Sequence, residues 1–281
     1  MPRAMSVRFY DVRKVHPRGM SLRDALSHIA ALGQPGTREL QLGPGVRVRL
    51  EEFTPTAGFL EGEITRVRAD DHPSEVHPHG TVQLNVAGPI GEGVAFKFRE
   101  RDHVLAIQYD NRIVAPSRFF EYVMQMGQPA QFEADAKADA RALAHFRRHP
   151  MKKVKIRLAQ PQDLAGVEAP MQSAARAFRG LARDYAAPMI TLELGVGHED
   201  GALGADAKRM VEGFVRRSGI DPNVKSVKIT PDNGAGIENA EINLLDALLS
   251  FRTNIPTLPN DPAANYAARQ RVVSRALANH T

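Results

Sequence analysis

The sequence contains no cysteine and no tryptophan among its 281 residues. Without cysteine there are no disulfides, thiolate zinc sites, iron–sulfur clusters or cysteine nucleophiles. No run of eighteen apolar residues occurs, and the first twenty residues lack the apolar core of a signal peptide. We therefore expect a cytoplasmic protein with no direct membrane insertion.

Recognisable catalytic motifs are also missing. No glutamate is followed two positions later by lysine, as a metal-dependent nuclease motif requires, and no Gly-x-Ser-x-Gly sequence occurs. The glycine-rich stretches GPIGEGVAF, LGVGHEDGALG and PDNGAG lack the Walker ending and the dinucleotide fingerprint. We expect a protein that is not an enzyme, has no cofactor and works by binding.

Histidines gather in the stretch ADDHPSEVHPHG, which contains His72, His77 and His79 beside several carboxylates. Imidazole and carboxylate groups can bind a divalent cation. Their spacing matches no known metal motif, and His72 and His77 each precede a proline, so a surface loop is favoured and no metal is predicted. A metal-dependent hydrolase that uses this loop remains an alternative.

The order of apolar patterns predicts an α+β fold with two domains. The first domain, residues 1–150, begins with a strand in VRFYDVRKV and a helix capped by Ser21. Short alternating segments between Gly, Pro and Asp turns then predict an antiparallel sheet with flanking helices. A helix is expected from Pro116, and the alanine-rich residues 130–149 predict another helix, which Pro150 ends.

The second domain, residues 151–250, is predicted to be a smaller α/β sheet domain that can move relative to the first. Its expected elements are strands at 154–158, 189–194 and 224–229 and helices at 169–185, 205–217 and 243–252. The last segment, residues 251–281, is predicted to be helical from Pro262 onward.

Positive charge is concentrated in the middle of the chain. Residues 141–183 carry ten Lys or Arg and two Asp or Glu, whereas the segments on either side are net acidic. Six cations fall within eleven residues there: Arg147, Arg148, Lys152, Lys153, Lys155 and Arg157. Because strand side chains alternate, Lys153, Lys155 and Arg157 are expected on one face and the apolar residues between them on the other.

Arg176, Arg179 and Arg183 recur at helical spacing, so they share one face of a helix and are expected to extend the same patch. Lys225 and Lys228, near a strand, are weaker candidates. Rows of cations neutralise phosphates and release counterions, which gives salt-sensitive affinity for nucleic acid without sequence preference. A solvated surface with cations at a helix end explains the same pattern without any ligand.

The basic block contains two aromatic residues, Phe146 and Phe178, and helical spacing favours burying both. Stacking on unpaired bases needs exposed rings. Double-stranded DNA is therefore the predicted ligand, bound through its backbone. The alternative is a protein-interaction module that docks the basic patch on an acidic partner.

The order of elements resembles that of the phage lambda RexA family of exclusion proteins. The resemblance runs through GVAFKFRERDHVLAIQYDNRIVAPSRFFEYVMQM, the basic strand MKKVKIRL, MITLEL, AKRMVEGF and VKSVKIT. It implies a homodimer that binds DNA without sequence preference, similar to the recombination regulator RdgC. It also implies an intracellular sensor in abortive infection, with a membrane effector encoded nearby. The chain departs from the family at GVGHED, where basic residues would be expected, so the predicted DNA contacts come from charge geometry alone.

Overall fold

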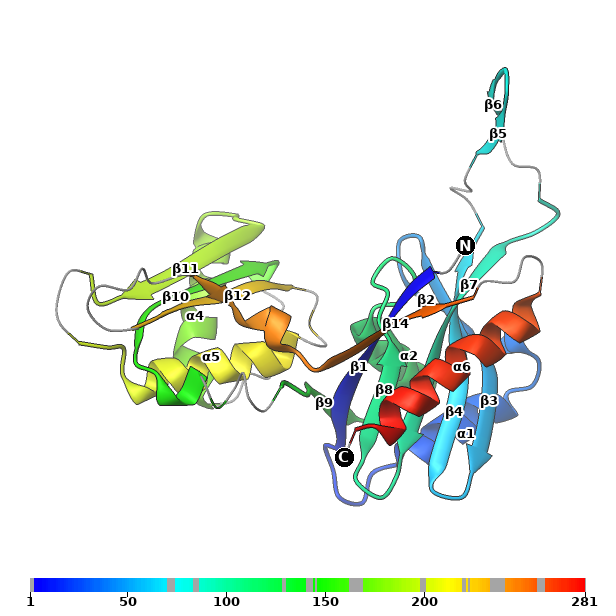
Figure 1. The fold of residues 1–281 in the computed structure, drawn as a ribbon, viewed down its shortest axis with the longest axis horizontal. Helices are drawn as coiled ribbons and strands as arrows, with labels where there is room; N and C mark the ends of the chain where they lie inside the picture. The colour runs from blue at the N-terminus through cyan, green and yellow to red at the C-terminus, as the bar shows by residue number, and fades with distance from the viewer. Residues whose placement is uncertain are drawn as a thin grey trace. The chain divides into compact units, whose positions relative to one another are not determined.

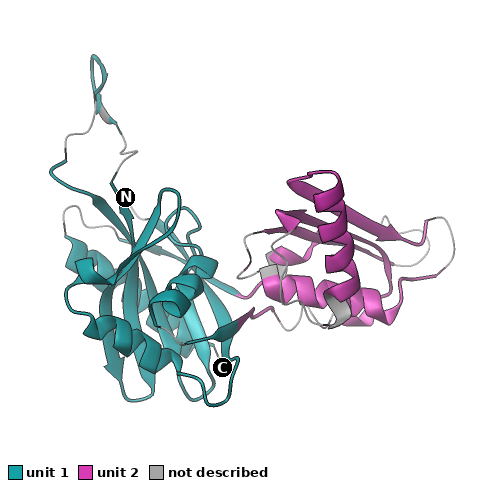
Figure 2. Cartoon of the chain, turned by 180° about the vertical axis from the view of Figure 1, so that it is seen from behind, with its two compact units in different colours: residues 1–133, 250–281 teal, residues 134–249 magenta. Residues whose placement is uncertain are grey.

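The computed structural model describes residues 3–69, 74–82, 86–127, 130–139, 144, 146–161, 169–197, 201–218, 221, 223–232, 241–256 and 261–280. The chain divides into two compact units (Figure 2). Unit 1 comprises residues 1–133 and 250–281, and unit 2 comprises residues 134–249. Both contain antiparallel sheets with helices packed on them, which confirms the predicted α+β class.

Unit 1 is built on an eight-stranded sheet in the order β14-β1-β8-β7-β4-β3-β2, with β9 also paired to β1. The strands are β1 (Arg3–Lys14), β2 (Glu39–Gly43), β3 (Val46–Thr56), β4 (Phe59–Arg68), β7 (Ile90–Arg99), β8 (Val104–Gln108), β9 (Phe132–Ala136) and β14 (Ser250–Ile255). A separate two-stranded hairpin contains β5 (Glu75–His77) and β6 (Gly80–Val82).

Helices cover both faces of this sheet (Figure 1). On one face lie α1 (Leu22–Ala31), which a Ser21–Asp24 capping box begins, and α2 (Pro116–Met126), which starts with proline. Phe96 of β7 packs edge-on against Phe119 of α2. The other face carries α6 (Pro262–Ala278), and a short 3-10 helix spans Pro35–Arg38. The core of unit 1 therefore has two apolar layers with the sheet between them.

Unit 2 contains a four-stranded sheet in the order β11-β10-β12-β13. Its elements are β10 (Met151–Ala159), α4 (Ala169–Asp184), β11 (Met189–Gly195), α5 (Ala205–Ser218), β12 (Val224–Pro231), β13 (Ile242–Asn243) and the 3-10 helix Leu244–Ala247. Phe178 of α4 and Phe214 of α5 meet edge-on with ring centroids 6.2 Å apart, and both rings are buried. The two helices thus form one layer against the sheet.

Two predicted helices are wrong over part of their length: residues 144 and 146–148 are helical and Leu244–Ala247 is a 3-10 helix, but a strand occupies another part of each range. Within residues 130–149, Phe132–Ala136 is strand β9, because Phe132, Ala134 and Ala136 are buried in alternation, which is the strand period. Within residues 243–252, the 3-10 helix ends and β14 follows, which pairs with β1 from Arg3↔Ile255 to Arg8↔Ser250. Pairing with a strand far away in sequence overrides local helix propensity in both segments.

The division into units differs from the prediction at residue 150 and in the placement of the C-terminal segment. Unit 1 comprises residues 1–133 and resumes at residue 250, so the C-terminal segment 251–281 belongs to unit 1 and is not a separate part. The reason is that β14 joins the sheet of unit 1 and α6 packs on that sheet. No helix in the described part of the chain is long and apolar enough to cross a bilayer.

Candidate nucleic-acid interface

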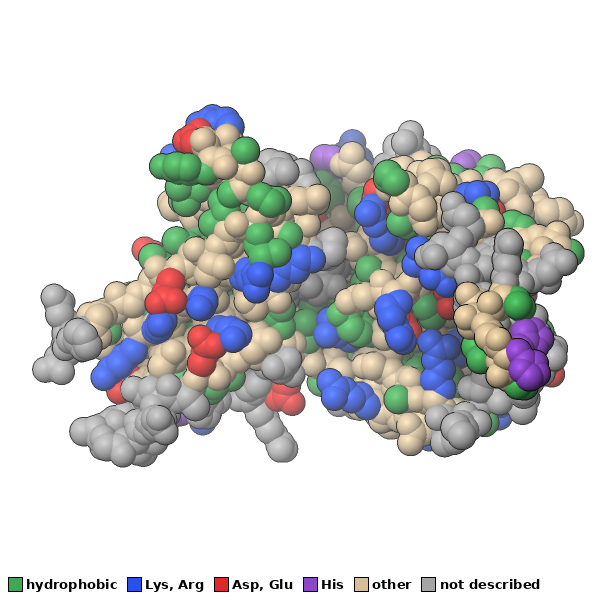
Figure 3. All heavy atoms as spheres, turned by 90° about the horizontal axis from the view of Figure 1, so that it is seen from above, with side chains coloured by type: hydrophobic (Ala, Val, Ile, Leu, Met, Phe, Trp, Pro, Cys, Tyr) green, Lys and Arg blue, Asp and Glu red, His purple; other side chains and the backbone are tan. Residues whose placement is uncertain are grey.

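Strand β10 places its two sets of side chains as the sequence predicts. Val154, Ile156 and Leu158 are buried, facing the layer formed by α4 and α5. Lys153, Lys155 and Arg157 alternate with them on the opposite face, and in Figure 1 both α4 and α5 lie on the other side of the sheet. Figure 3 shows Lys and Arg side chains exposed on unit 2 beside Asp and Glu side chains. Unit 2 therefore presents one side of its sheet to solvent.

Neighbouring strands add polar groups to this exposed side. Lys155 lies directly opposite Lys228 of β12 on one flank and Glu193 of β11 on the other. We call this surface the open sheet face; its members are Lys153, Lys155, Arg157, Thr191, Glu193, Ser226, Lys228 and Thr230. Like charges directly opposite each other destabilise a sheet. Repulsion between Lys155 and Lys228 therefore lowers stability locally, and a bound anion would reduce this repulsion.

Two carboxylates partly neutralise the open sheet face. Glu193 lies 2.7 Å from the Nζ of Lys153 and 3.8 Å from that of Lys155. Glu241, just before β13, lies 2.6 Å from the Nζ of Lys228. Hydrogen bonds from Lys153 and Lys228 hold the pKa values of Glu193 and Glu241 below the usual range.

These pairs are weak because their members are exposed. Lys153 and Glu193 keep 43% and 46% of their side-chain surface in contact with solvent, where screening leaves an ion pair little net stability. The four cations against two carboxylates leave the surface with a net charge of +2. Phosphate oxygens can therefore replace the carboxylates without disturbing the core.

Arg157 differs from the lysines around it. Its Nε lies 2.8 Å from the sulfur of Met189, and no carboxylate in the described ranges lies within ion-pair distance of it. An arginine fork matches phosphate geometry with two parallel donors. Arg157 is consequently the cation on the open sheet face with the least competition for a phosphate.

The remaining predicted contacts lie elsewhere on unit 2. Arg176, Arg179 and Arg183 are exposed on the outer side of α4, whose inner side buries Ala174, Ala175, Phe178 and Ala182. Arg183 also lies 2.9 Å from Asp184. The sheet and the helix layer separate these arginines from the open sheet face.

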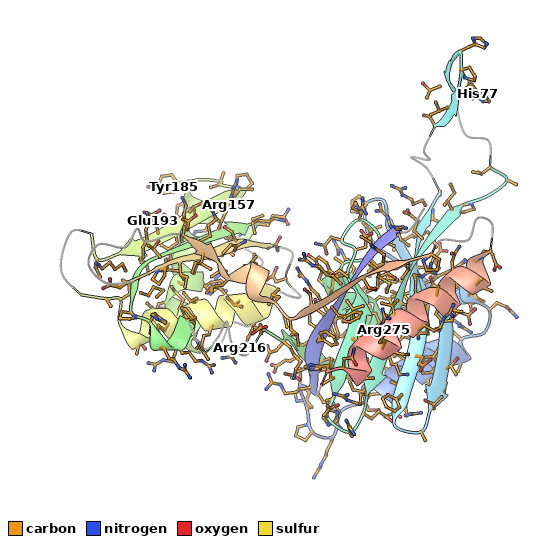
Figure 4. All side chains as sticks on the ribbon, in the orientation of Figure 1. His77, Arg157, Tyr185, Glu193, Arg216 and Arg275 are labelled. Atoms are coloured by element: carbon orange, nitrogen blue, oxygen red, sulfur yellow. The ribbon has the colours of Figure 1, made fainter. Side chains whose placement is uncertain are left out.

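Arg147 and Arg148 form a third group. Both are exposed in the helical residues 146–148, and Arg147 lies 2.7 Å from Glu212 of α5. Arg216 shares that glutamate at 3.6 Å and lies on the helix side, away from Arg157 and Glu193 (Figure 4). Lys152 sits at a bulge of β10, 3.5 Å from Asp232. The structure therefore brings three of the nine predicted residues together on one face and does not gather all nine into the single patch that the sequence predicts.

Both aromatic side chains of the basic block are buried, as expected, with Phe146 3% and Phe178 1% exposed. Sequence reasoning missed Tyr185, which is 77% exposed where α4 leads to β11 (Figure 4). It also missed Glu193 and gave Lys228 little weight. The alternation of polar and apolar residues in each strand indicates that Glu193 and Lys228 are exposed. It does not show which strands pair, so it could not place them beside Lys155.

The predicted histidine loop is only partly described. His77 and His79 lie at the exposed β5–β6 hairpin, whereas His72 is outside the described residues. Across the described ranges, no three His, Asp or Glu side chains are close enough to share a metal ion.

Unit 1 contains an open pocket of about 500 Å³, lined by charged and apolar residues, that the sequence did not predict. Its floor includes Glu63, which is 5% exposed and forms an ion pair with Arg269 of α6. A Cβ on Gly93 would lie 1.5 Å from the Glu63 carboxylate, so only glycine leaves room for it. Burial raises the pKa of Glu63, although Arg269 opposes the shift. Every arginine on the cavity wall already has a carboxylate partner.

No protein-family model matches the chain, and no curated protein matches it either. The resemblance to the RexA family therefore stays a prediction.

Proposed function

We propose that unit 2 binds double-stranded DNA without sequence preference, through the open sheet face. The observation that carries the proposal is the row of Lys153, Lys155 and Arg157 on a sheet side that no described helix covers, with Lys228 beside it. Successive members of the row stand about 6.7 Å apart, because residues two apart along a strand share a face. Such a row supports contacts to several phosphates at once.

The chemistry of the surface favours phosphate contacts over base reading. Its neutral members, Thr191, Ser226 and Thr230, have short hydroxyl side chains that donate to phosphate oxygens. No described element projects from it in the way that a recognition helix enters a major groove. Contacts of this kind position a duplex but carry no direct sequence information.

Two triple variants with the same change in charge test the proposal. Replacing Lys153, Lys155 and Arg157 with alanine removes the row. We expect the slope of log Kd against log salt to fall by about 2.7, which is about 0.9 for each phosphate that the variant no longer neutralises. Affinity should fall equally for unrelated DNA sequences, as filter binding over a salt series would measure.

The matched control replaces Arg176, Arg179 and Arg183 with alanine. These arginines lie on the outer side of α4, so the salt slope should stay near that of the unchanged protein. If the control loses as much slope as the sheet variant, or if the sheet variant binds normally, the open sheet face is not the DNA-binding surface.

The cellular role that we propose rests on the RexA resemblance. In that role the protein is a cytoplasmic sensor in phage exclusion, and DNA binding controls a membrane effector encoded nearby. The measurement is plaque formation on cells that carry the gene and its neighbours. Exclusion should be lost in the Lys153, Lys155 and Arg157 variant and kept in the α4 control.

A further inference from the structure

Strand β11 is an edge of the unit 2 sheet, and no described strand pairs with its outer side. Val196 N donates to Lys152 O at 3.1 Å and Gln160 N to Pro188 O at 2.8 Å. Hydrogen-bonded pairs alternate along an antiparallel ladder. Even-numbered residues of β11 therefore bond to β10, and the N–H and C=O groups of Thr191 and Glu193 point outward.

Apolar side chains gather at this same edge. Unit 2 exposes five large apolar side chains among its described residues, and four of them are Leu181, Tyr185, Met189 and Leu194. They lie on the end of α4, on β11 and in the segment between the two. The fifth, Ile242, belongs to β13 at the opposite edge. Free backbone groups beside exposed apolar side chains are the features by which strands add to a sheet.

We propose that β11 pairs with β11 of a second copy of this chain, antiparallel about a two-fold axis at Leu192. In this register Thr191 faces Glu193 of the partner subunit through outward hydrogen bonds. Ile190 then packs against Leu194 of the partner subunit on the helix side. The strand MITLELG is thus complementary to itself over its whole length.

Charge disfavours one of the two neighbouring registers. Shifting the axis to Glu193 would set two identical carboxylates directly opposite each other, which is destabilising. With the axis at Leu192, each Glu193 faces a threonine and keeps its ion pair with Lys153. A second copy therefore provides hydrogen-bond partners for the outward N–H and C=O groups of β11 and places no like charges opposite each other.

Pairing would join the two sheets into one and place two open sheet faces side by side. The two β10 strands would be three strand spacings apart, or about 14 Å. The benefit for DNA binding rests on the proposed function, because it doubles the number of cations that one duplex can meet. The pairing itself depends only on the edge.

Sedimentation analysis of the full chain, free of nucleic acid, tests the pairing. Thr191→Pro removes an outward N–H, and proline is tolerated on an edge strand where that group faces solvent. The two-fold axis makes each substitution count twice, so we expect the dissociation constant of the dimer to rise about tenfold or more. Leu194→Lys should act likewise by placing a cation beside Ile190 of the partner subunit.

Ile242→Lys is the matched control, since it alters an exposed apolar residue on the other edge and should leave the dimer intact. A monomeric unchanged protein would overturn the pairing. So would a Thr191→Pro variant that folds and still dimerises as tightly as the unchanged protein, or a dimer lost only in the control. DNA binding by a strictly monomeric protein would retain the proposed function while removing this interface.

Discussion

The two sheets of this protein differ in how far their charged side chains are buried. In unit 1 both faces are covered, and the guanidinium of Arg99, 4% exposed, donates to Asp102 and to the carbonyls of Leu277 and His280. In unit 2 no described helix covers one face, and the ion pairs on that face are exposed. A buried pair is fixed by the structure around it, whereas an exposed pair can exchange its partner for a ligand. Whether a cation lies on a covered or an uncovered sheet face is therefore a better guide to polyanion binding than the number of cations.

The largest expected effect comes from breaking the buried pair of unit 1. Arg269→Ala leaves the Glu63 carboxylate buried without a cation, which should lower the free energy of unfolding by about 3–5 kcal/mol at neutral pH. The pKa of Glu63 is already raised in the folded protein. Its ionisation therefore costs stability as the pH rises through that folded pKa, and the cost vanishes below the unfolded pKa. The deficit of the variant should shrink toward pH 4, as urea unfolding at several pH values would show.

The double variant Glu63→Gln and Arg269→Met serves as the control for this prediction. It replaces the pair with neutral groups of similar size, so much of the lost stability should return. A deficit in Arg269→Ala that is small or independent of pH would contradict the assignment of Glu63 as a buried carboxylate.

A smaller effect, of opposite sign, is expected on the open sheet face. Glu193→Gln frees Lys153 and Lys155 from the carboxylate between them and raises the net charge of the surface by one. DNA affinity should increase several-fold at low salt, and the salt slope should steepen by at most about 0.9. Fluorescence anisotropy with a labelled duplex would measure both. Weaker binding by this variant would mean that Glu193 positions the lysines and does not compete with phosphate.

The smallest effect is expected from Arg147→Ala. Arg147 is exposed and shares Glu212 with Arg216, so its loss should change the free energy of unfolding by no more than about 0.5 kcal/mol. DNA affinity should stay unchanged, because this arginine lies outside the open sheet face. A clear loss of affinity would extend the interface to the helix side of unit 2 and weaken the contrast between the two units.

Local patterns predicted the faces of single elements correctly. The alternation of Lys153, Lys155 and Arg157 with apolar residues gave the two sides of β10, and the spacing of Arg176, Arg179 and Arg183 gave one face of α4. The sequence could not show that the sheet separates these two sets, because that depends on which side of β10 the helix packs. Nor could it show that Glu193 faces Lys155, since strand register is set by contacts across the whole sheet. Strands β9 and β14 were missed for the same reason: their partner β1 lies far away in sequence.

The pairing of β1 with β14 has a consequence for how the protein is made. Strand β1 gains this neighbour only when residues 250–255 have been synthesised, after every residue of unit 2. Unit 2 is continuous in sequence and can fold during translation, whereas unit 1 must hold its earlier strands in an incomplete sheet until β14 has been synthesised. Contacts between such distant residues also slow folding. Chain termination anywhere before β14 would thus leave Arg3–Arg8 of β1 without the partner strand β14, and an unpaired strand edge favours aggregation.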